Sequence, residues 1–230
     1  MCIRAYWYRI GPGVYFREIP ENRIMPAEPL TRDRPIVKGR AALLIIDVQN
    51  GTFGPAEAKA KPEFHAATTV RVIPNIRRLL DAFRHRRLEV IYTVIENLTD
   101  DGRDRSLDYK LSGLNIAKGS WEARVVEEVA PKDDELVLPK TSSSVFNSTN
   151  LNYLLRNIGI EDVFVTGFLT DQCIDHAVKD GADLGYYMTC VHDACATETE
   201  AQHEAALQSF KGYCRMLATD QVLRLLEKAQ

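Results

Sequence analysis

Three side chains in this sequence have the types needed for nucleophilic acyl chemistry: Cys173, Asp47 and Lys140. A thiol attacks a carbonyl carbon after a neighbouring base takes its proton, and a carboxylate can then return that proton to a leaving amine. A nearby ammonium group keeps the carboxylate ionised and favours the thiolate. An acid, a cation and a thiol brought to one place would therefore suit cleavage of an acyl group from an amine.

The pattern around Cys173 predicts a strand followed by a helix. Residues 163–165 have the β-branched and aromatic side chains of a buried strand, Gly167 ends it, and a helical pattern runs over 170–182. Cys173 lies three residues after Thr170, the predicted cap, where unpaired backbone N–H groups and the helix dipole favour an anion. The thiol should therefore tend toward thiolate. This stretch alone leaves a nucleophile and a small buried core residue equally open.

Asp47 and Lys140 follow two other predicted strands. Residues 41–46 form a continuous apolar run, as expected of a strand buried on both faces of a parallel sheet, and Asp47 closes it. Lys140 follows a predicted strand at 135–138. Ligands of open α/β sheets bind outside the carboxyl ends of the strands, so we expect all three side chains at this edge. Taken singly, an Asp there is often a turn residue and a Lys after proline is usually solvated.

The remaining pattern alternates strands and helices. Helices are predicted at 70–85, 123–129, 151–157, 200–210 and from 220, and further strands at 90–95, 186–191 and 215–218. This alternation predicts a Rossmann-like α/β fold, a three-layer, six-stranded, mostly parallel sheet with helices on both faces and right-handed crossovers. The polar connection at 96–118 is longer than most and is a candidate lid or substrate wall.

Residues 1–38 differ from the rest and predict an N-terminal arm ahead of one domain at 39–230. Aromatic-rich stretches at 6–10 and 14–19 flank Gly11-Pro-Gly13 as in a small hairpin, and a stretch rich in proline and charge follows at 20–35. A poorly ordered arm and docking onto this or a neighbouring subunit are both open, since exposed aromatic patches usually have a partner.

Composition restricts the classes of function. The chain has 230 residues, 45% hydrophobic and 27% charged, with a net charge of −3, which is enough for one domain with a sizeable core. This near-neutral balance gives no electrostatic argument for binding nucleic acid or an anionic membrane. Five cysteines without CxxC pairs argue against a disulfide framework or a zinc ribbon and for a reducing compartment. Without an apolar leader or a membrane-length segment, we expect a cytoplasmic protein.

Four groups of residues form a recognisable set. They are Leu43-Leu-Ile-Ile-Asp-Val-Gln-Asn50 with Phe53, Lys118-Gly-Ser-Trp121, Leu138-Pro-Lys140 with Phe146 and Leu151, and Thr166-Gly-Phe-Leu-Thr-Asp-Gln-Cys173. In order and spacing, over about residues 40–220, they resemble the isochorismatase-like cysteine hydrolases. The resemblance implies a catalytic triad with Cys173 as nucleophile, Asp47 as base and Lys140 as the lysine. It also implies a cis peptide between Phe168 and Leu169, with the amides of Leu169 and Cys173 forming an oxyanion hole.

Departures from the family pattern narrow the activity. Branches that hydrolyse isochorismate lack the cysteine, so Cys173 implies cleavage of a C–N bond. Nicotinamidase members hold a metal with an Asp-x-His and a further His after the first strand; this chain has only His65 there, so we expect no metal and no cofactor. Leu169 stands where a smaller Ala is common, which changes the expected pocket. The segment at 118–121 is most similar to the branch that acts on ureidoacrylate, biuret and N-carbamoyl compounds.

The sequence thus predicts a cysteine amidohydrolase that cleaves a small linear ureide or amide through a thioester and releases ammonia or an amine. Phe53, Gln172 and Gln208 are candidate substrate-binding residues, although each is also ordinary for its place. The family implies a homo-oligomer, a dimer or a tetramer. Alternatives are a nicotinamidase-like or other small-amide hydrolase and a catalytically silent binding module of the same fold, which the intact Asp–Lys–Cys set disfavours.

Two other polar residues are given structural interpretations. His176 lies three residues after Cys173 on the same predicted helix, and a Cys–His dyad is the minority alternative there. Asp193 ends a predicted strand and is expected to cap the next segment rather than to act as a catalytic acid.

Overall fold

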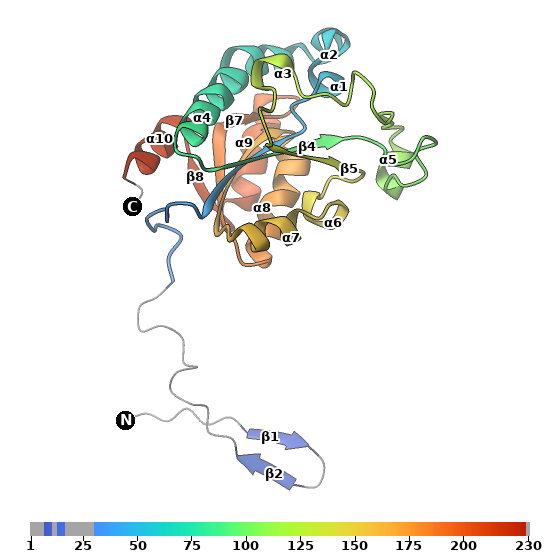
Figure 1. Ribbon diagram of the computed structural model, residues 1–230. Helices are drawn as coiled ribbons and strands as arrows, with labels where there is room; N and C mark the ends of the chain where they lie inside the picture. The colour runs from blue at the N-terminus through green and yellow to red at the C-terminus, as the bar shows by residue number, and fades with distance from the viewer. Residues whose placement is uncertain (1–6, 11–12, 17–29, 229–230) are drawn as a thin grey trace. The chain divides into compact units, whose positions relative to one another are not determined.

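The computed structural model describes residues 7–10, 13–16 and 30–228 (Figure 1). The chain divides into two compact units, Met1–Arg32 and Asp33–Gln230. In the first unit β1 (Trp7–Ile10) pairs antiparallel with β2 (Gly13–Phe16), which confirms the predicted hairpin. The alternatives for the arm, poor order or docking, concern residues that lie largely outside the described ranges.

The second unit is built on one parallel sheet. Its described part contains six strands in the order β5-β4-β3-β6-β7-β8, each parallel to its neighbours. The strands are β3 (Ala41–Ile46), β4 (Glu89–Ile95), β5 (Leu136–Lys140), β6 (Asp162–Phe168), β7 (Tyr187–Ala196) and β8 (Arg215–Leu217). All six residues of β3 are buried, as the continuous apolar run predicts for a central strand.

Helices cover both faces of this sheet, which confirms the predicted α/β fold (Figure 1). Leu43 and Ile45 of β3 pack in one apolar layer with α4 (Ile73–His85) and α10 (Thr219–Glu227). The alternate residues, Leu44 and Ile46, pack in a second layer with α7 (Leu151–Ile158), α8 (Asp175–Asp183) and α9 (Glu200–Phe210). The two-residue period of a strand therefore sends successive side chains into opposite layers.

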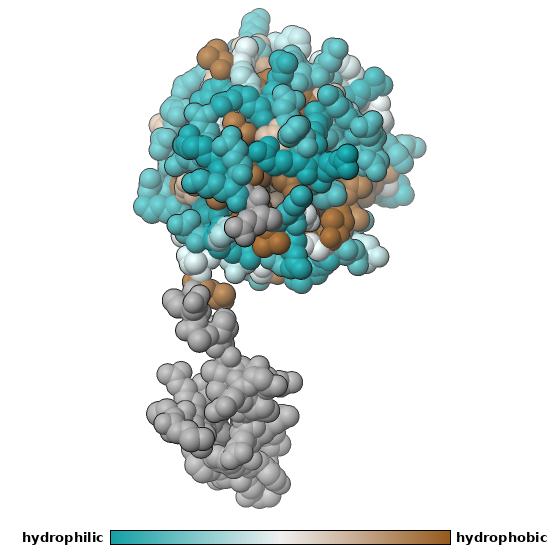
Figure 2. Space-filling view, turned by 60° about the vertical axis from the view of Figure 1, so that its left-hand side comes forward, coloured by the Kyte–Doolittle hydropathy of each residue, from teal (hydrophilic) through white to brown (hydrophobic). Residues whose placement is uncertain are grey.

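The surface agrees with this division. The face of the second unit seen in Figure 2 is mostly hydrophilic, and its apolar residues form small separate patches. Among the described residues no helix has the length and apolar character needed to cross a membrane.

Three connections differ from the predicted elements. Short helices α1 (Asn50–Phe53), α2 (Pro55–Ala60) and α3 (Pro62–Ala67) occupy a region where we predicted none, and the π-helix η2 (Thr68–Val72) overlaps the start of the helix predicted at 70–85. Each is too short for a helical period to develop in the sequence. Helix α5 (Leu107–Leu111) interrupts the predicted polar connection, and α6 (Val145–Ser148) follows β5.

The helix predicted at 123–129 is wrong. Only the 3-10 turn η3 (Glu127–Val129) forms there. The backbone before it bonds to the segment after β3 instead of to itself: the amide of Asn50 donates to the carbonyl of Arg124, and the amide of Val126 donates to that of Val48. Pairing with a distant segment has overridden the local helical pattern.

Candidate active site

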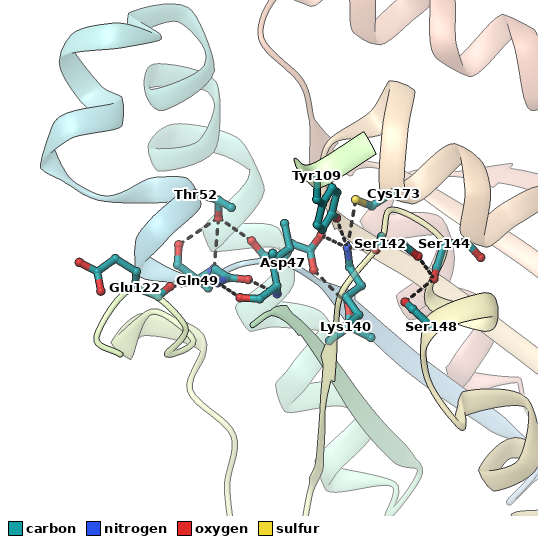
Figure 3. A network of polar contacts seen from close by, with 12 residues as sticks. Asp47, Gln49, Thr52, Tyr109, Glu122, Lys140, Ser142, Ser144, Ser148 and Cys173 are labelled. Atoms are coloured by element: carbon teal, nitrogen blue, oxygen red, sulfur yellow. Dashed lines mark hydrogen bonds and ion pairs between the residues drawn. The ribbon is translucent and has the colours of Figure 1, made fainter. Parts of the chain in front are cut away.

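The structure brings Asp47, Lys140 and Cys173 together at the carboxyl edge of the sheet (Figure 3). The Nζ atom of Lys140 lies 2.9 Å from Oδ2 of Asp47 and 3.3 Å from Sγ of Cys173. Asp47 is 1% exposed, Lys140 is 0% exposed and Cys173 is 5% exposed. Residues far apart in sequence thus meet because the ends of β3, β5 and β6 share one edge.

Lys140 reaches Asp47 across an intervening strand. β4 lies between β5 and β3, and Lys140 pairs in register with Ile95, so strand β5 extends two residues past its predicted end. The hydroxyl of Thr93 on β4 donates to Oδ1 of Asp47 over 3.4 Å.

The ammonium group of Lys140 has two further acceptors. It donates to the hydroxyl of Tyr109 over 3.0 Å and to the carbonyl of Ser142 over 2.9 Å. Tyr109 comes from α5, within the connection at 96–118 (Figure 3). The lysine is therefore held from the sheet, from the loop after β5 and from the segment predicted as a lid.

The backbone turns sharply at Asp47. Its φ angle is 58°, in the left-handed region, which Asp tolerates better than most residues. The hydroxyl of Thr52 donates to the carbonyl of Asp47 over 2.6 Å, and the Asp47 amide donates to the carbonyl of Thr93 over 2.9 Å. These bonds fix the direction in which the carboxylate leaves the strand.

The buried amide of Gln49 ties this turn to its surroundings. Its Nε2 donates to the carbonyls of Ile95 and Glu122, each over 2.9 Å, and its Oε1 accepts the amide of Ile95 over 2.6 Å. The Gln49 side chain is fully buried and all these partners are backbone groups. It therefore joins the end of β3 to the end of β4 and to the segment at 122.

The turn before Cys173 has the predicted cis peptide between Phe168 and Leu169. Cys173 then lies in a π-helical turn, η4 (Thr170–Ile174), whose N-cap is Leu169. The prediction that Thr170 caps the helix is wrong, because its hydroxyl bonds to Nδ1 of His203 over 2.8 Å instead. The hydroxyl of Thr197 donates to Oδ1 of Asp171 over 2.5 Å, so side chains after β7 and on α9 hold the turn.

Electrostatics corrects the expectation of a resting thiolate. Burial, and then the charge of Asp47, raise the pKa of Cys173 to about 12, and Lys140 offsets this only in part. Burial also raises the pKa of Asp47, while the charge of Lys140 acts to lower it. Burial acts to lower the pKa of Lys140, but the charges of Asp47 and Cys173 outweigh it and leave the pKa raised. A buried thiol beside a lysine–carboxylate pair is protonated at neutral pH.

Comparison with known proteins places this chain in a family. The model of the isochorismatase domain matches residues 41–221. The chain belongs to the isochorismatase family of hydrolases.

Several solved structures have the same fold as this chain. A cysteine hydrolase from Pseudomonas syringae pv. phaseolicola 1448A is 24% identical with a TM-score of 0.76, over 89% of this chain and 100% of that one. An isochorismatase family protein from Desulfovibrio vulgaris subsp. vulgaris str. Hildenborough is 25% identical with a TM-score of 0.72, over 82% and 99%. N-carbamoylsarcosine amidase from Thermoplasma acidophilum is 25% identical with a TM-score of 0.65, over 79% and 97%.

The candidate substrate-binding residues of this isochorismatase-family protein lie in different places. Phe53 is half-buried and stacks on His65, with ring centroids 4.7 Å apart. Gln172 is exposed beside Cys173 in η4. Gln208 is exposed on α9 and accepts a hydrogen bond from Lys211 over 2.6 Å. It lies five residues beyond His203, about 7 Å further along the helix.

Of the two residues given structural interpretations, His176 faces solvent and Asp193 has a structural partner. His176 is exposed, in contrast to buried Cys173 on the preceding turn. The carboxylate of Asp193 accepts both the amide and the hydroxyl of Thr219 over 2.8 Å, so it fixes the first residue of α10. The structural role expected for Asp193 is therefore found, but at α10 and not in the next segment, and Asp193 lies inside β7 instead of at the end of the strand.

Among the described residues, one group has three potential metal ligands close together: Glu200, His203 and Glu204, whose ligand atoms lie within 4.8 Å of one another. The group is partly engaged, because Nδ1 of His203 bonds to Thr170 and Glu200 forms an ion pair with Arg71. It lies on α9 and shares no residue with the Asp47, Lys140 and Cys173 set.

Sequence reasoning missed two residues of this family member's site. Gln49 lies inside the motif after the first strand, and its position two residues after Asp47 was the available signal for a role at the sheet edge. Tyr109 has no such signal, since it is one aromatic residue in a polar connection. Only the folded path of 96–118 carries it to Lys140.

Proposed function

We propose that this family member is a cysteine amidohydrolase that acts on a small amide or linear ureide. The observation that carries the proposal is the buried contact of Lys140 with both Asp47 and Cys173. A thiol beside a carboxylate of raised pKa can transfer its proton as the sulfur attacks, and the lysine stabilises whichever partner carries the charge.

The first half of the reaction forms a thioester. Sγ of Cys173 attacks the carbonyl carbon while Asp47 accepts the thiol proton. The negative charge that develops on the carbonyl oxygen is received by the amides of Leu169 and Cys173, a contribution of about 3–4 kcal/mol per donor. Asp47 then gives its proton to the nitrogen, the C–N bond breaks, and ammonia or an amine leaves.

The second half restores the thiol. Asp47 takes a proton from a water molecule as the oxygen of this water attacks the carbonyl carbon of the thioester. The intermediate collapses, the C–S bond breaks, and the departing sulfur recovers the proton from Asp47. The acyl group leaves as the acid, so one water molecule is consumed for each C–N bond broken.

Two observations support a ureide as the substrate class. The sequence at 118–121 is similar to the ureide-hydrolysing branch, and one of the similar solved structures is an N-carbamoylsarcosine amidase. The buried polar groups of Asp47, Lys140 and Tyr109 suit a small polar molecule held by hydrogen bonds better than a large apolar one. Under this proposal Gln172, which lies in the same turn as Cys173, is a candidate substrate-binding residue, and Phe53 stays a second candidate.

The test measures ammonia release from biuret, ureidoacrylate, N-carbamoyl amino acids and nicotinamide by the wild-type protein and by Cys173→Ser. We expect the best substrate to be a ureide and the variant to lose at least about a thousandfold in kcat/KM. Cys214→Ser is the matched control, because Cys214 is 4% exposed against 5% for Cys173. More than about a tenth of wild-type activity in Cys173→Ser contradicts the thioester mechanism. Preference for nicotinamide would replace the ureide by the nicotinamidase alternative.

A further inference from the structure

Tyr109 is the side chain that α5 turns inward. It is 3% exposed, whereas its neighbours Asp108 and Lys110 are exposed. Its ring packs in a small apolar cluster with Ile95, Ile116 and Ala123.

Two hydrogen bonds made by Ser106 set this orientation. The hydroxyl of Ser106 accepts the amide of Tyr109 over 3.2 Å at the start of α5, and the Ser106 amide donates to the carbonyl of Thr141 over 2.8 Å. Thr141 directly follows Lys140, so the segment that carries Tyr109 is tied to the strand that carries the lysine.

Lys140 has more polar partners than protons. An ammonium group donates three protons. In the part of the chain that the structure describes, four partners surround it: the carbonyl of Ser142 at 2.9 Å, the hydroxyl of Tyr109 at 3.0 Å and Sγ of Cys173 at 3.3 Å accept hydrogen bonds, and Oδ2 of Asp47 lies 2.9 Å away in an ion pair. Sulfur is the weakest acceptor among them. The tyrosine oxygen therefore competes with Cys173 for a proton.

We infer that Tyr109 is a positioning residue: its hydroxyl takes one of the three Lys140 protons and so weakens the hydrogen bond that Lys140 donates to Cys173, as long as the segment 96–118 is in place. The inference rests on the proposed function, which gives Cys173 and Lys140 their roles. Displacing the segment removes this competing acceptor, strengthens the hydrogen bond from Lys140 to the sulfur and favours the thiolate. The reactivity of the thiol is thereby linked to the position of a segment distant in sequence from Cys173.

The surrounding charges agree with this assignment. The titratable groups that face Cys173 are Asp47 after β3, Lys140 on β5 and Tyr109 on α5. Burial raises the pKa of Tyr109, although the charge of Lys140 opposes it, so the phenol is neutral at physiological pH. It accepts from Lys140 as a neutral oxygen, and removing it changes no formal charge in the site.

The experiment compares Tyr109→Phe with Tyr92→Phe. Tyr92 is a matched control because its hydroxyl is also buried and accepts from a cation, Nη2 of Arg84, over 3.1 Å. The rate constant for alkylation of Cys173 by iodoacetamide is measured across pH, with the modified peptide identified by mass spectrometry. We expect Tyr109→Phe to react faster at each pH below the thiol pKa, by about threefold for each unit that this pKa falls, because the gain in thiolate is partly offset by lower nucleophilicity. Tyr92→Phe should match the wild type.

Two outcomes overturn the inference. Unchanged or slower alkylation of Tyr109→Phe means that the hydroxyl does not compete for the proton. Equally faster alkylation in both variants means that the substitutions loosen the packing of the protein in general. Ultraviolet titration of the thiolate gives a second measure, which a purely structural role would not move, and it should shift to lower pH in Tyr109→Phe only. Because these measurements need no substrate, they remain decisive even if Cys173→Ser keeps its turnover and the proposed function fails.

Discussion

The Nζ atom of Lys140 lies 2.9 Å from Oδ2 of Asp47, and both side chains are out of contact with water. Removing one partner of such a pair strands the other as a buried charge. We expect Lys140→Met to abolish turnover and to lower the free energy of unfolding by about 3–5 kcal/mol, measured by urea denaturation.

The control for this change is Lys179→Met. Lys179 pairs with Asp175 one helical turn away on the surface, over 2.8 Å, and should contribute about 0.5 kcal/mol or less. The double variant Asp47→Asn/Lys140→Met should regain part of the lost stability and remain inactive. If Lys140→Met costs no more than Lys179→Met, the pair is not the buried ion pair described above.

Gln49 should matter for stability more than its neutral side chain suggests. Gln49→Leu removes the side-chain hydrogen bonds to the amide and carbonyl of Ile95 and to the carbonyl of Glu122, which keeps only the amide of Gly51, so we expect a loss of about 2–4 kcal/mol. Hydrogen exchange at the Ile95 amide should accelerate. Gln208→Leu, on the surface of α9, is the control and should stay near wild type. If the two variants were equally stable, Gln49 would not help to position Asp47.

Stability should fall in mild acid because of His203. Burial is the main factor that lowers the pKa of His203, helped by Arg71 and His192 and opposed by Glu200 and Glu204. Above about pH 6.5, the ordinary histidine value, neither state binds the proton. Below it the unfolded chain binds a proton that the folded protein resists, so the free energy of unfolding decreases until the lowered folded pKa is reached.

The measurement is urea denaturation at several pH values between about 5 and 8. His203→Asn keeps a polar atom for Thr170 and cannot titrate, so its stability should depend less on pH. His176→Asn, an exposed site, should retain the wild-type slope. A wild-type slope in His203→Asn as well would assign the acid sensitivity to other groups.

Chelation should leave the activity intact. Asp47, Lys140 and Cys173 supply the base, the cation and the nucleophile, so no step of the proposed reaction calls for a metal ion. We expect kcat/KM to be unchanged after exhaustive dialysis against a chelator. Loss of the rate and its restoration by one divalent ion would contradict this, and Glu200, His203 and Glu204 would then be the first ligands to substitute.

The sequence supported a prediction of the sheet because strands buried on both faces have a plain signature. The apolar run of β3, with Asp47 after it, and the strand–helix change before Cys173 needed no tertiary information. Topology then turned strand ends into neighbours, which is why the expected meeting of Asp47, Lys140 and Cys173 could be stated in advance.

Features set by tertiary contacts could not be anticipated. The segment at 123–129 has a helical pattern. Its backbone is nevertheless mostly non-helical, because Arg124 accepts a hydrogen bond from the amide of Asn50 and the amide of Val126 donates to the carbonyl of Val48. Tyr109 reaches Lys140 through the path of a connection that has no periodicity. The position of Cys173 near the start of a helix suggested a thiolate. Burial, however, is the main factor that sets the pKa of Cys173, and the sequence does not show how deeply a residue is buried.

The strand order also determines when the sheet can close during synthesis. β3 is the first strand of the main sheet to be made, yet one of its two neighbours is β6, which begins at Asp162. At about 5–20 residues per second the ribosome needs about 6–20 s to cover that interval, during which one edge of a wholly apolar strand stays unpaired. An open apolar edge pairs readily with other chains. Nascent or truncated chains that stop before β6 should therefore aggregate, and the cell must shield β3 until its second neighbour emerges.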